Sequence, residues 1–177
     1  MRLFIAAMLP QDTCHHLLNM QQALVENMVS CRLTGPEHLH LTLRFIGEVG
    51  DEQLIKITDW FDAFASTNHL NAPCDITGLG GFSSRDGQTV FAALRVPDSL
   101  IQVQTTLEQG LRALGIPPET RPWVPHITLA RKARLRRSLS DIPTKNHHFY
   151  IKQLALIESQ LTREGPVYTP LIISPAG

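Results

Sequence analysis

The stretch LFIAAMLPQD (residues 3–12) is echoed much later in the chain by VFAALRVPDS (residues 90–99). The two stretches align without gaps from Phe4 on Phe91 to Pro10 on Pro97, an offset of 87 residues. Each begins with a short apolar run typical of a buried strand and continues through a proline into apolar residues at helical spacing. This duplicated unit of strand, proline and helix decides the fold that we predict.

A second duplicated motif, His-x-Thr-Leu, follows each of these units. The copies are HLTL (residues 40–43) and HITL (residues 126–129), at an offset of 86 residues. We therefore predict an internal repeat over residues 3–46 and 90–131, within a single bilobal domain of residues 1–177. Chance likeness between two strand and helix units is the alternative, and the matching prolines and histidines at a nearly constant offset disfavour it.

The pattern along the chain predicts an α+β fold. Strands are expected at residues 3–8, 40–46, 75–82 and 89–96, with a bulge at the glycines of the third. Helices are expected after Pro10, with Met28 in the apolar stripe, from about Asp51, and after Pro97. We expect two similar lobes related by a pseudo-two-fold axis, with antiparallel sheets lining a central cleft and helices outside. Both histidine motifs would then face this cleft.

Composition sets limits on function and location. The 177 residues are 43% hydrophobic and 18% charged, which is ordinary for a globular domain. Lysine and arginine number 16, as do aspartate and glutamate, so the molecule lacks the overall positive field that binds long nucleic acids nonspecifically. The three cysteines are odd in number and lack CxxC spacing, so we expect reduced thiols. The short apolar start predicts neither a signal peptide nor a membrane anchor, and we expect a cytoplasmic monomer.

The residues of the motif point to acid and base chemistry in the cleft. Successive side chains of a strand alternate between faces, so one face of the first motif is predicted to present His40, Thr42 and Arg44. The opposite, core-facing side is predicted to hold Leu41, Leu43 and Phe45. In the second copy, His126 and Thr128 share a face in the same way. A single strand histidine is commonly structural, whereas two in duplicated surroundings favour a site.

In-line displacement at phosphorus suits two such pairs facing each other. The attacking and leaving oxygens occupy opposite apices, so one imidazole can act as a base while the other acts as an acid. An imidazole titrates near pH ~6.5, which suits both roles at neutral pH. The two threonine hydroxyls can donate hydrogen bonds to the nonbridging oxygens as charge develops on them. This chemistry requires no metal.

These residues resemble the two-histidine (2H) phosphoesterases, and within them the bacterial RNA 2′,3′-cyclic phosphodiesterases, also called 2′-5′ RNA ligases. The resemblance covers nearly the whole chain and is carried by LFIAAMLP (residues 3–10), EHLHLTLRFIGEV (37–49), RPWVPHITLAR (121–131) and SQLTREGPVYTPL (159–171). It implies that His40 donates a proton to the leaving 3′ oxygen, that His126 activates water, and that Thr42 and Thr128 hold the phosphate.

The same resemblance implies the partners of the protein. The substrates would be RNA ends or small nucleotides with a 2′,3′-cyclic phosphate, the product a 2′-phosphate, and no cofactor would be needed. Two questions stay open: whether the reverse reaction, 2′-5′ RNA ligation, matters in the cell, and whether the RNA is tRNA.

Five further residues are candidate substrate contacts. The family pattern HITLxR makes Arg131 a cation beside the phosphate, although strand alternation points it to the opposite face unless a bulge intervenes. Arg44 has the correct alternation for the cleft. Three aromatic residues are candidates for stacking on a base: Tyr168, Trp123 and Phe82. The basic run RKARLRR (residues 131–137) either tracks an RNA backbone or forms a solvated loop.

Two alternatives differ from this enzyme in kind. His38, His40 and His126 could form a three-histidine zinc site of a hydrolase. The second motif has Val124 where His38 would recur, and no carboxylate accompanies either motif, which disfavours this alternative. The other alternative is an RNA-binding module without catalysis, in which the histidines only contact an RNA end.

Overall fold

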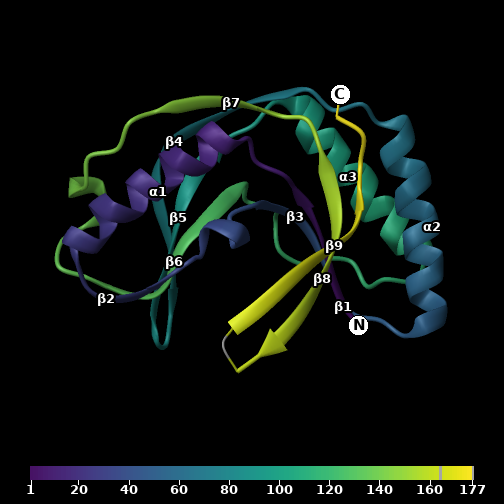
Figure 1. The fold of residues 1–177 in the computed structure, drawn as a ribbon, viewed down its shortest axis with the longest axis horizontal. Coiled ribbons are helices and arrows are strands. Elements are labelled where there is room, and N and C mark those ends of the chain that lie inside the picture. Colours follow the sequence, from purple (N-terminus) through teal and green to yellow (C-terminus); the bar gives the residue numbers. More distant parts are fainter. Residues whose placement is uncertain (164, 177) are drawn as a thin grey trace.

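The structure, a computed structural model, describes residues 1–163 and 165–176 and confirms the α+β class (Figure 1). The strands are β1 (Arg2–Ala7), β2 (Met28–Leu33), β3 (Leu41–Glu48), β4 (Ala72–Ser84), β5 (Gly87–Arg95), β6 (His126–Leu135), β7 (His147–Ile151), β8 (Leu154–Thr162) and β9 (Gly165–Ile173). The helices are α1 (Gln11–Glu26), α2 (Asp51–Thr67) and α3 (Asp98–Ala113), with single 3₁₀ turns at Pro36–His38 and Leu139–Asp141.

Two antiparallel sheets form the two lobes. The first sheet has the strand order β3-β1-β8-β9 and the second has the order β2-β6-β5-β4-β7. Both histidine motifs therefore lie beside the strand that precedes them in the repeat, β3 beside β1 and β6 beside β5. The β4–β5 and β8–β9 hairpins project on the same side of the molecule, toward the bottom of Figure 1.

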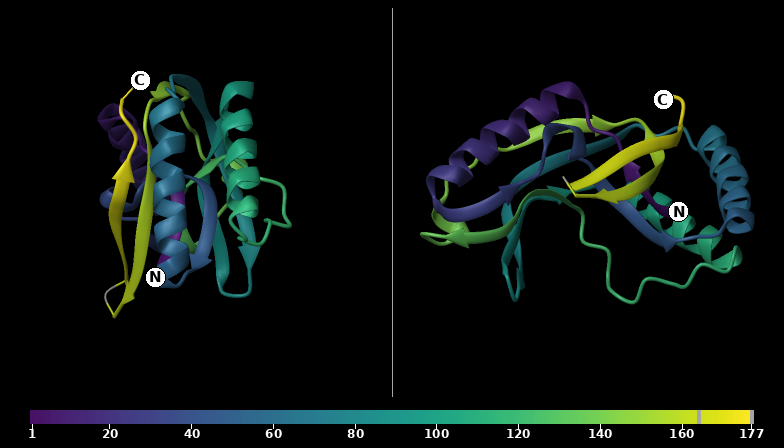
Figure 2. Two further views of the ribbon diagram at one scale, coloured as in Figure 1. Left: turned by 90° about the vertical axis from the view of Figure 1, so that its right-hand side faces the viewer. Right: turned by 60° about the horizontal axis from the view of Figure 1, so that its bottom comes forward.

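The helices that follow β1 and β5 are exchanged between the lobes. Helix α1 leaves β1 of the first sheet and packs on β2, β6 and β7 of the second. Helix α3 leaves β5 of the second sheet and packs beside β3 of the first, where α2 also lies. Figures 1 and 2 show α1 at one end of the molecule and α2 with α3 at the other. Each sheet thus takes a covering helix from the other half of the chain.

Strand β1 shows how one strand serves both the core and the cleft. Leu3, Ile5 and Ala7 are buried in the main core under the helices. Phe4 and Ala6 alternate with them and belong to a second apolar cluster on the opposite face of the first sheet. Because both faces are covered, five consecutive residues of this strand are buried, which explains the continuous apolar run in the sequence.

Several local predictions are tested by these elements. Both repeat helices begin directly after the expected prolines, Pro10 and Pro97, and β4 has a register shift between Ile76 and Gly78 where a bulge was expected. The assignment of Met28 to the first helix is wrong. The helix ends at Glu26, and Met28 is buried as the first residue of β2. Strand β2 and the C-terminal strands β7, β8 and β9 were not predicted.

No helix in the described part of the chain is both long and apolar enough to cross a membrane. All three cysteines are free thiols, and Cys74 is fully buried.

Candidate active site

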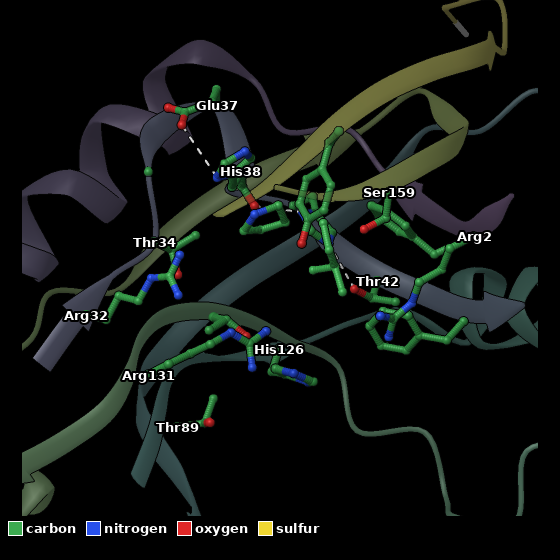
Figure 3. Close-up of a pocket in the computed structure, with 18 of the residues that line it drawn as sticks. Arg2, Arg32, Thr34, Glu37, His38, Thr42, Thr89, His126, Arg131 and Ser159 are labelled. Atoms are coloured by element: carbon green, nitrogen blue, oxygen red, sulfur yellow. Dashed lines mark hydrogen bonds and ion pairs between the residues drawn. The ribbon is translucent and has the colours of Figure 1, made fainter. Parts of the chain in front are cut away.

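A cavity of about 720 Å³ lies between the two sheets and is lined by both histidine motifs. His40 and Thr42 contribute from the first sheet, and His126 and Thr128 contribute from the second. Figure 3 shows Thr42 and His126 on facing walls of this cavity. The structure therefore brings together the four residues that the duplicated motif singles out.

A β-bulge follows the threonine in both copies of the motif. In the first sheet, Thr42 pairs with Ala6 and Arg44 pairs with Ile5, so Leu43 is the extra residue. In the second sheet, Thr128 pairs with Phe91 and Ala130 pairs with Val90, so Leu129 is the extra residue. A bulge of this kind moves the side chains that directly follow it to the other face of the strand. The repeat thus extends to a local irregularity of the backbone.

The first bulge overturns the prediction that Arg44 contacts the substrate. Arg44 is only 6% exposed and points away from the cavity. Its guanidinium donates hydrogen bonds to the Glu108 carboxylate of α3 and to the backbone carbonyls of Phe45 and Pro117. Phe45, which alternation assigned to the core, is exposed and lines the cavity. Arg44 thus joins β3 to α3.

The second bulge removes the objection to Arg131. Ala130 is fully buried on the core side, and Arg131 is exposed and lines the cavity together with Thr128. At the motif offset of 86 residues, Arg131 occupies the position that Phe45 holds in the first lobe. The two halves of the site are therefore alike in their histidines and threonines and differ at this position, where one lobe offers a cation and the other an aromatic ring.

The same backbone contact orients both imidazoles. His40 Nδ1 lies 2.7 Å from the carbonyl oxygen of His38, and His126 Nδ1 lies 2.7 Å from that of Val124. Because a carbonyl only accepts, each Nδ1 carries the proton and each Nε2 has a free lone pair in the neutral ring. His40 Nε2 accepts a hydrogen bond from the Thr42 hydroxyl at 3.0 Å. No hydrogen bond to His126 Nε2 occurs within the described residues, so that lone pair is available to a ligand.

Aromatic rings pack against each of the two motif histidines. The ring centroid of Phe4 lies 5.0 Å from that of His40, and Tyr168 of β9 lies 5.5 Å from it, edge on. In the second lobe, Phe91 and Phe82 lie 5.1 and 5.2 Å from the His126 ring. Phe4 and Phe91 are the residues that the repeat aligns. Tyr168 and Phe82 both line the cavity, where contact with a base stays a prediction.

Burial lowers the pKa of His40 to about 4. The hydrogen bond to the His38 carbonyl opposes this change, whereas the charges of His38, Arg131 and His126 add to it. His40 is therefore neutral near pH 7 when the cavity holds no anion. An anion placed among these groups would favour the imidazolium and raise the pKa.

Trp123 lies away from the cavity, and the basic run at residues 131–137 reaches it only through Arg131. Trp123 does not line the cavity. It packs against the core, and its indole N–H donates a hydrogen bond to the Thr42 carbonyl at 3.0 Å. The basic run at residues 131–137 is not a loop, because β6 continues to Leu135. Of this run, only Arg131 lines the cavity, and Arg136 donates to the Met28 carbonyl.

The described residues do not form the metal-binding group that the zinc alternative needs. Within residues 1–163 and 165–176, no three histidine, cysteine, aspartate or glutamate side chains are grouped closely enough to hold a metal ion. The His38 ring instead lies edge on to Tyr168, with centroids 4.7 Å apart, and its Nδ1 lies 3.4 Å from Glu37 Oε1.

Sequence reasoning missed part of the cavity wall. Besides Phe4 and Phe45, these residues include Arg2, Arg32, Thr34, Thr89 and Ser159. Only the repeat alignment could have pointed to one of them, because it places Phe4 on Phe91. Arg32 lies on the unpredicted strand β2, and Ser159 lies on the unpredicted strand β8.

Paired imidazoles and hydroxyls across a cleft are the groups that a phosphoesterase site needs. In agreement with this class, the profile of the LigT like phosphoesterase family matches residues 8–92 and 94–168. The chain belongs to this family, as the resemblance predicted.

Relatives with assigned activities match over almost their full length. The chain is 30% identical to the RNA 2′,3′-cyclic phosphodiesterase of Thermus thermophilus, over 97% of this chain and 88% of that protein. It is 28% identical to the enzyme of the same name from Methanothermobacter thermautotrophicus, over 96% of both chains.

Crystal structures of relatives have the same fold. A Thermus thermophilus protein superposes with a TM-score of 0.80 at 28% identity, covering 98% of this chain and 97% of that one. Escherichia coli LigT complexed with 3′-AMP gives a TM-score of 0.74 at 26% identity, covering 97% and 95%. The two antiparallel sheets and three helices described above are thus those of LigT structures.

Proposed function

We infer that the protein is an RNA 2′,3′-cyclic phosphodiesterase, which opens the cyclic phosphate at the end of an RNA or a nucleotide. Full-length similarity to proteins with this activity supports the assignment. The observation that carries the mechanism is the facing pair of imidazoles, each with Nδ1 bound to the carbonyl two residues before it. This shared contact leaves Nε2 as the reactive nitrogen in both lobes.

In the proposed reaction, His126 acts as the base. Its Nε2 lone pair takes a proton from water as the water oxygen attacks phosphorus. The bond from phosphorus to the 3′ oxygen breaks on the opposite side, and His40 Nε2 donates a proton to that oxygen. The products are a 2′-phosphate and a free 3′ hydroxyl, and the net change is the addition of one water molecule.

His40 must gain a proton before it can act as the acid. In the free protein, His40 Nε2 accepts a hydrogen bond from the Thr42 hydroxyl, and burial lowers the pKa of His40 to about 4. A bound cyclic phosphate brings a negative charge to the site and so favours the imidazolium. Once His40 is protonated, its Nε2 no longer accepts, and the Thr42 hydroxyl can turn to donate to a phosphate oxygen. Substrate binding thus prepares both groups.

Thr128 and Arg131 complete the proposed phosphate site from the other lobe. Both line the cavity on the His126 side, and the Arg131 charge already acts on His40 across the cleft. Hydrogen bonds and positive charge directed at the nonbridging oxygens stabilise the charge that develops in the transition state. The asymmetry at Phe45 and Arg131 places this extra cation on the side of the base.

Product identification tests the proposal. Purified protein is incubated with adenosine 2′,3′-cyclic phosphate and with a short RNA ending in a cyclic phosphate, in the presence of EDTA. We expect a 2′-phosphate as the only product. A 3′-phosphate would reverse the assigned leaving oxygen. Loss of turnover in EDTA with recovery in zinc would indicate a metallohydrolase, and binding without turnover would indicate a non-catalytic RNA-end module.

A further inference from the structure

Arginines are concentrated in the cavity of a chain with no net charge. Three of them, Arg2, Arg32 and Arg131, line the cavity, and Glu37 is the one acidic residue in its described wall. Glu37 lies beside His38, with Oε1 3.4 Å from Nδ1. None of the three arginines forms an ion pair with another residue of the described chain. The cavity therefore offers more positive charge than a single cyclic phosphate would neutralise.

Two of these arginines are placed directly opposite each other. Arg32 on β2 and Arg131 on β6 are partners in the antiparallel ladder, and both side chains reach the cavity. Like charges at opposite positions of a sheet repel and destabilise the pair. A bound anion removes this repulsion, so the pairing itself points to a ligand with negative charge beyond the catalytic histidines.

The surroundings of Arg32 fit a phosphate. Thr34 lies two residues along the extended chain and lines the cavity beside it (Figure 3). A Cβ at Gly165 would lie 2.7 Å from Arg32 Nη2, so the glycine leaves room for the guanidinium against the β8–β9 hairpin. Arg32 is thus held between the lobes, with a hydroxyl donor next to it.

The position of Arg32 sets the distance from the reacting phosphorus. Because Leu129 is an extra residue, Thr128 and Arg131 are neighbours on the cavity face, about 7 Å apart along the strand. Arg32 lies one strand further, about 5 Å to the side. This separation suits a second phosphate one nucleotide away. Figure 3 shows Arg32 and Thr34 at one end of the cavity and Arg2 and Ser159 at the other.

We propose that Arg32 and Thr34, beside Arg131, form a second phosphate subsite that binds the phosphodiester on the 5′ side of the terminal nucleotide. The inference rests on the proposed function, since it takes the cyclic phosphate to lie between His40 and His126. It makes the preferred substrate an oligonucleotide, or a nucleotide with a 5′-phosphate, instead of a nucleoside cyclic phosphate.

The test compares two product analogues that differ only in the 5′-phosphate. Binding of adenosine 2′-monophosphate and adenosine 2′,5′-bisphosphate is measured by calorimetry at fixed ionic strength. We expect the bisphosphate to bind the wild-type protein about tenfold or more tightly, since hydrogen bonds to charged groups are strong. In Arg32→Gln the ratio of the two affinities should fall toward one, and Arg32→Lys should restore part of it.

Two further arginine variants serve as comparisons. Arg134→Gln changes an arginine of β6 that pairs with Ser30 of β2 and does not line the cavity, so it should keep the wild-type ratio. Arg2→Gln tests the opposite end of the cavity. Equal affinities in the wild type, an unchanged ratio in Arg32→Gln, or a loss only in Arg2→Gln would overturn the subsite. Thermal melting of Arg32→Gln should show a midpoint equal to or above that of the wild type.

Turnover separates this proposal from the proposed function. Adenosine 2′,3′-cyclic phosphate and its 5′-phosphorylated form are compared by kcat/KM. If neither is opened but the bisphosphate still binds more tightly through Arg32, the activity is wrong and the subsite stands. If both are opened equally well, and the binding ratio is one, the activity stands and the subsite is wrong.

Discussion

The side-chain amide of Gln21, on α1, donates a hydrogen bond to the backbone carbonyl of Leu129, the bulge residue of the second motif, at 2.8 Å. The same nitrogen donates to the Thr34 carbonyl at 2.8 Å, where β2 runs into the loop before the first motif. In the other lobe, Gln104 of α3 makes a longer contact of 3.5 Å with the carbonyl of Leu43. Each bulge carbonyl therefore faces a glutamine from a helix that belongs to the other half of the chain.

Replacing Gln21 by leucine should destabilise the protein and disturb the site. The Leu129 carbonyl would keep the Thr34 N–H as a donor, whereas the Thr34 carbonyl would lose the Gln21 amide, at a cost on the order of 1–3 kcal/mol. Urea unfolding measures this loss, and kcat/KM should also fall because the bulge directs Arg131 into the cavity. Gln22→Leu, at the exposed neighbouring position, is the control. Equal unfolding midpoints for the two variants would contradict the role of Gln21.

Binding of a phosphate ligand should be accompanied by uptake of a proton at His40. Above about pH 4 the free His40 is neutral, and the anion raises its pKa. Binding of adenosine 2′-monophosphate near pH 6 should therefore take up protons. The affinity for this ligand should rise as the pH is lowered from neutral to about 6. Calorimetry in buffers of different ionisation enthalpy measures the uptake.

The variant His40→Gln supplies the background for this measurement, because the phosphate of the ligand also titrates. Proton uptake in the wild type should exceed that in the variant. Equal uptake in both proteins would mean that His40 stays neutral in the complex, and it could not then be the acid.

The two histidines should each be needed for turnover but not for folding. We expect His40→Ala and His126→Ala to lower kcat by roughly 10² to 10⁴. Circular dichroism and thermal melting should show a folded protein in both cases, since neither ring belongs to the main core. Near-normal turnover in one variant would remove that histidine from the mechanism.

Arg44 should matter for stability and not for substrate binding. Glu108→Gln weakens the partner of a buried guanidinium, and breaking such a pair costs about 3–5 kcal/mol when one charge is left without a partner. Urea unfolding should show a large loss of stability, with KM for the cyclic phosphate close to that of the wild type. Lys56→Gln, which breaks the exposed pair with Glu52, should leave stability nearly unchanged. A raised KM with unchanged stability in Glu108→Gln would return Arg44 to the substrate site.

The repeat and the histidine motif were visible in the sequence because strand, proline, helix and His-x-Thr-Leu recur at nearly one offset. The positions after the threonines were not predictable by the alternation rule. The extra residue at Leu43 turns Arg44 inward and Phe45 into the cavity, and the one at Leu129 does the same for Ala130 and Arg131. A bulge depends on register with a neighbouring strand, which periodicity within one strand does not record.

The wall contributed by β2 and β8 was hidden for a different reason. Strand β2 lies at the edge of its sheet, and five of its six residues are exposed or half-buried. It follows α1 so closely that the apolar stripe of the helix, extended to Met28, hides the short alternation of this strand. Arg32 is recognisable as a cavity residue only once β2 is seen to pair with β6. Sequence therefore singled out the histidines, the threonines and Arg131, and tertiary pairing added Arg32 beside them.

The threonines test the proposed phosphate site separately from proton transfer. Thr42→Val and Thr128→Val keep the β-branched shape that suits a strand, so a loss of activity reports the missing hydroxyl. A hydrogen bond to an oxygen that gains charge in the transition state should be worth about 10- to 10³-fold in kcat. Thr42→Val also removes the hydroxyl that His40 Nε2 accepts in the free protein, so its pH profile should shift, whereas that of Thr128→Val should not. Wild-type rates in both valine variants would make these threonines strand-forming residues alone, and the two-lobed phosphate site would be wrong.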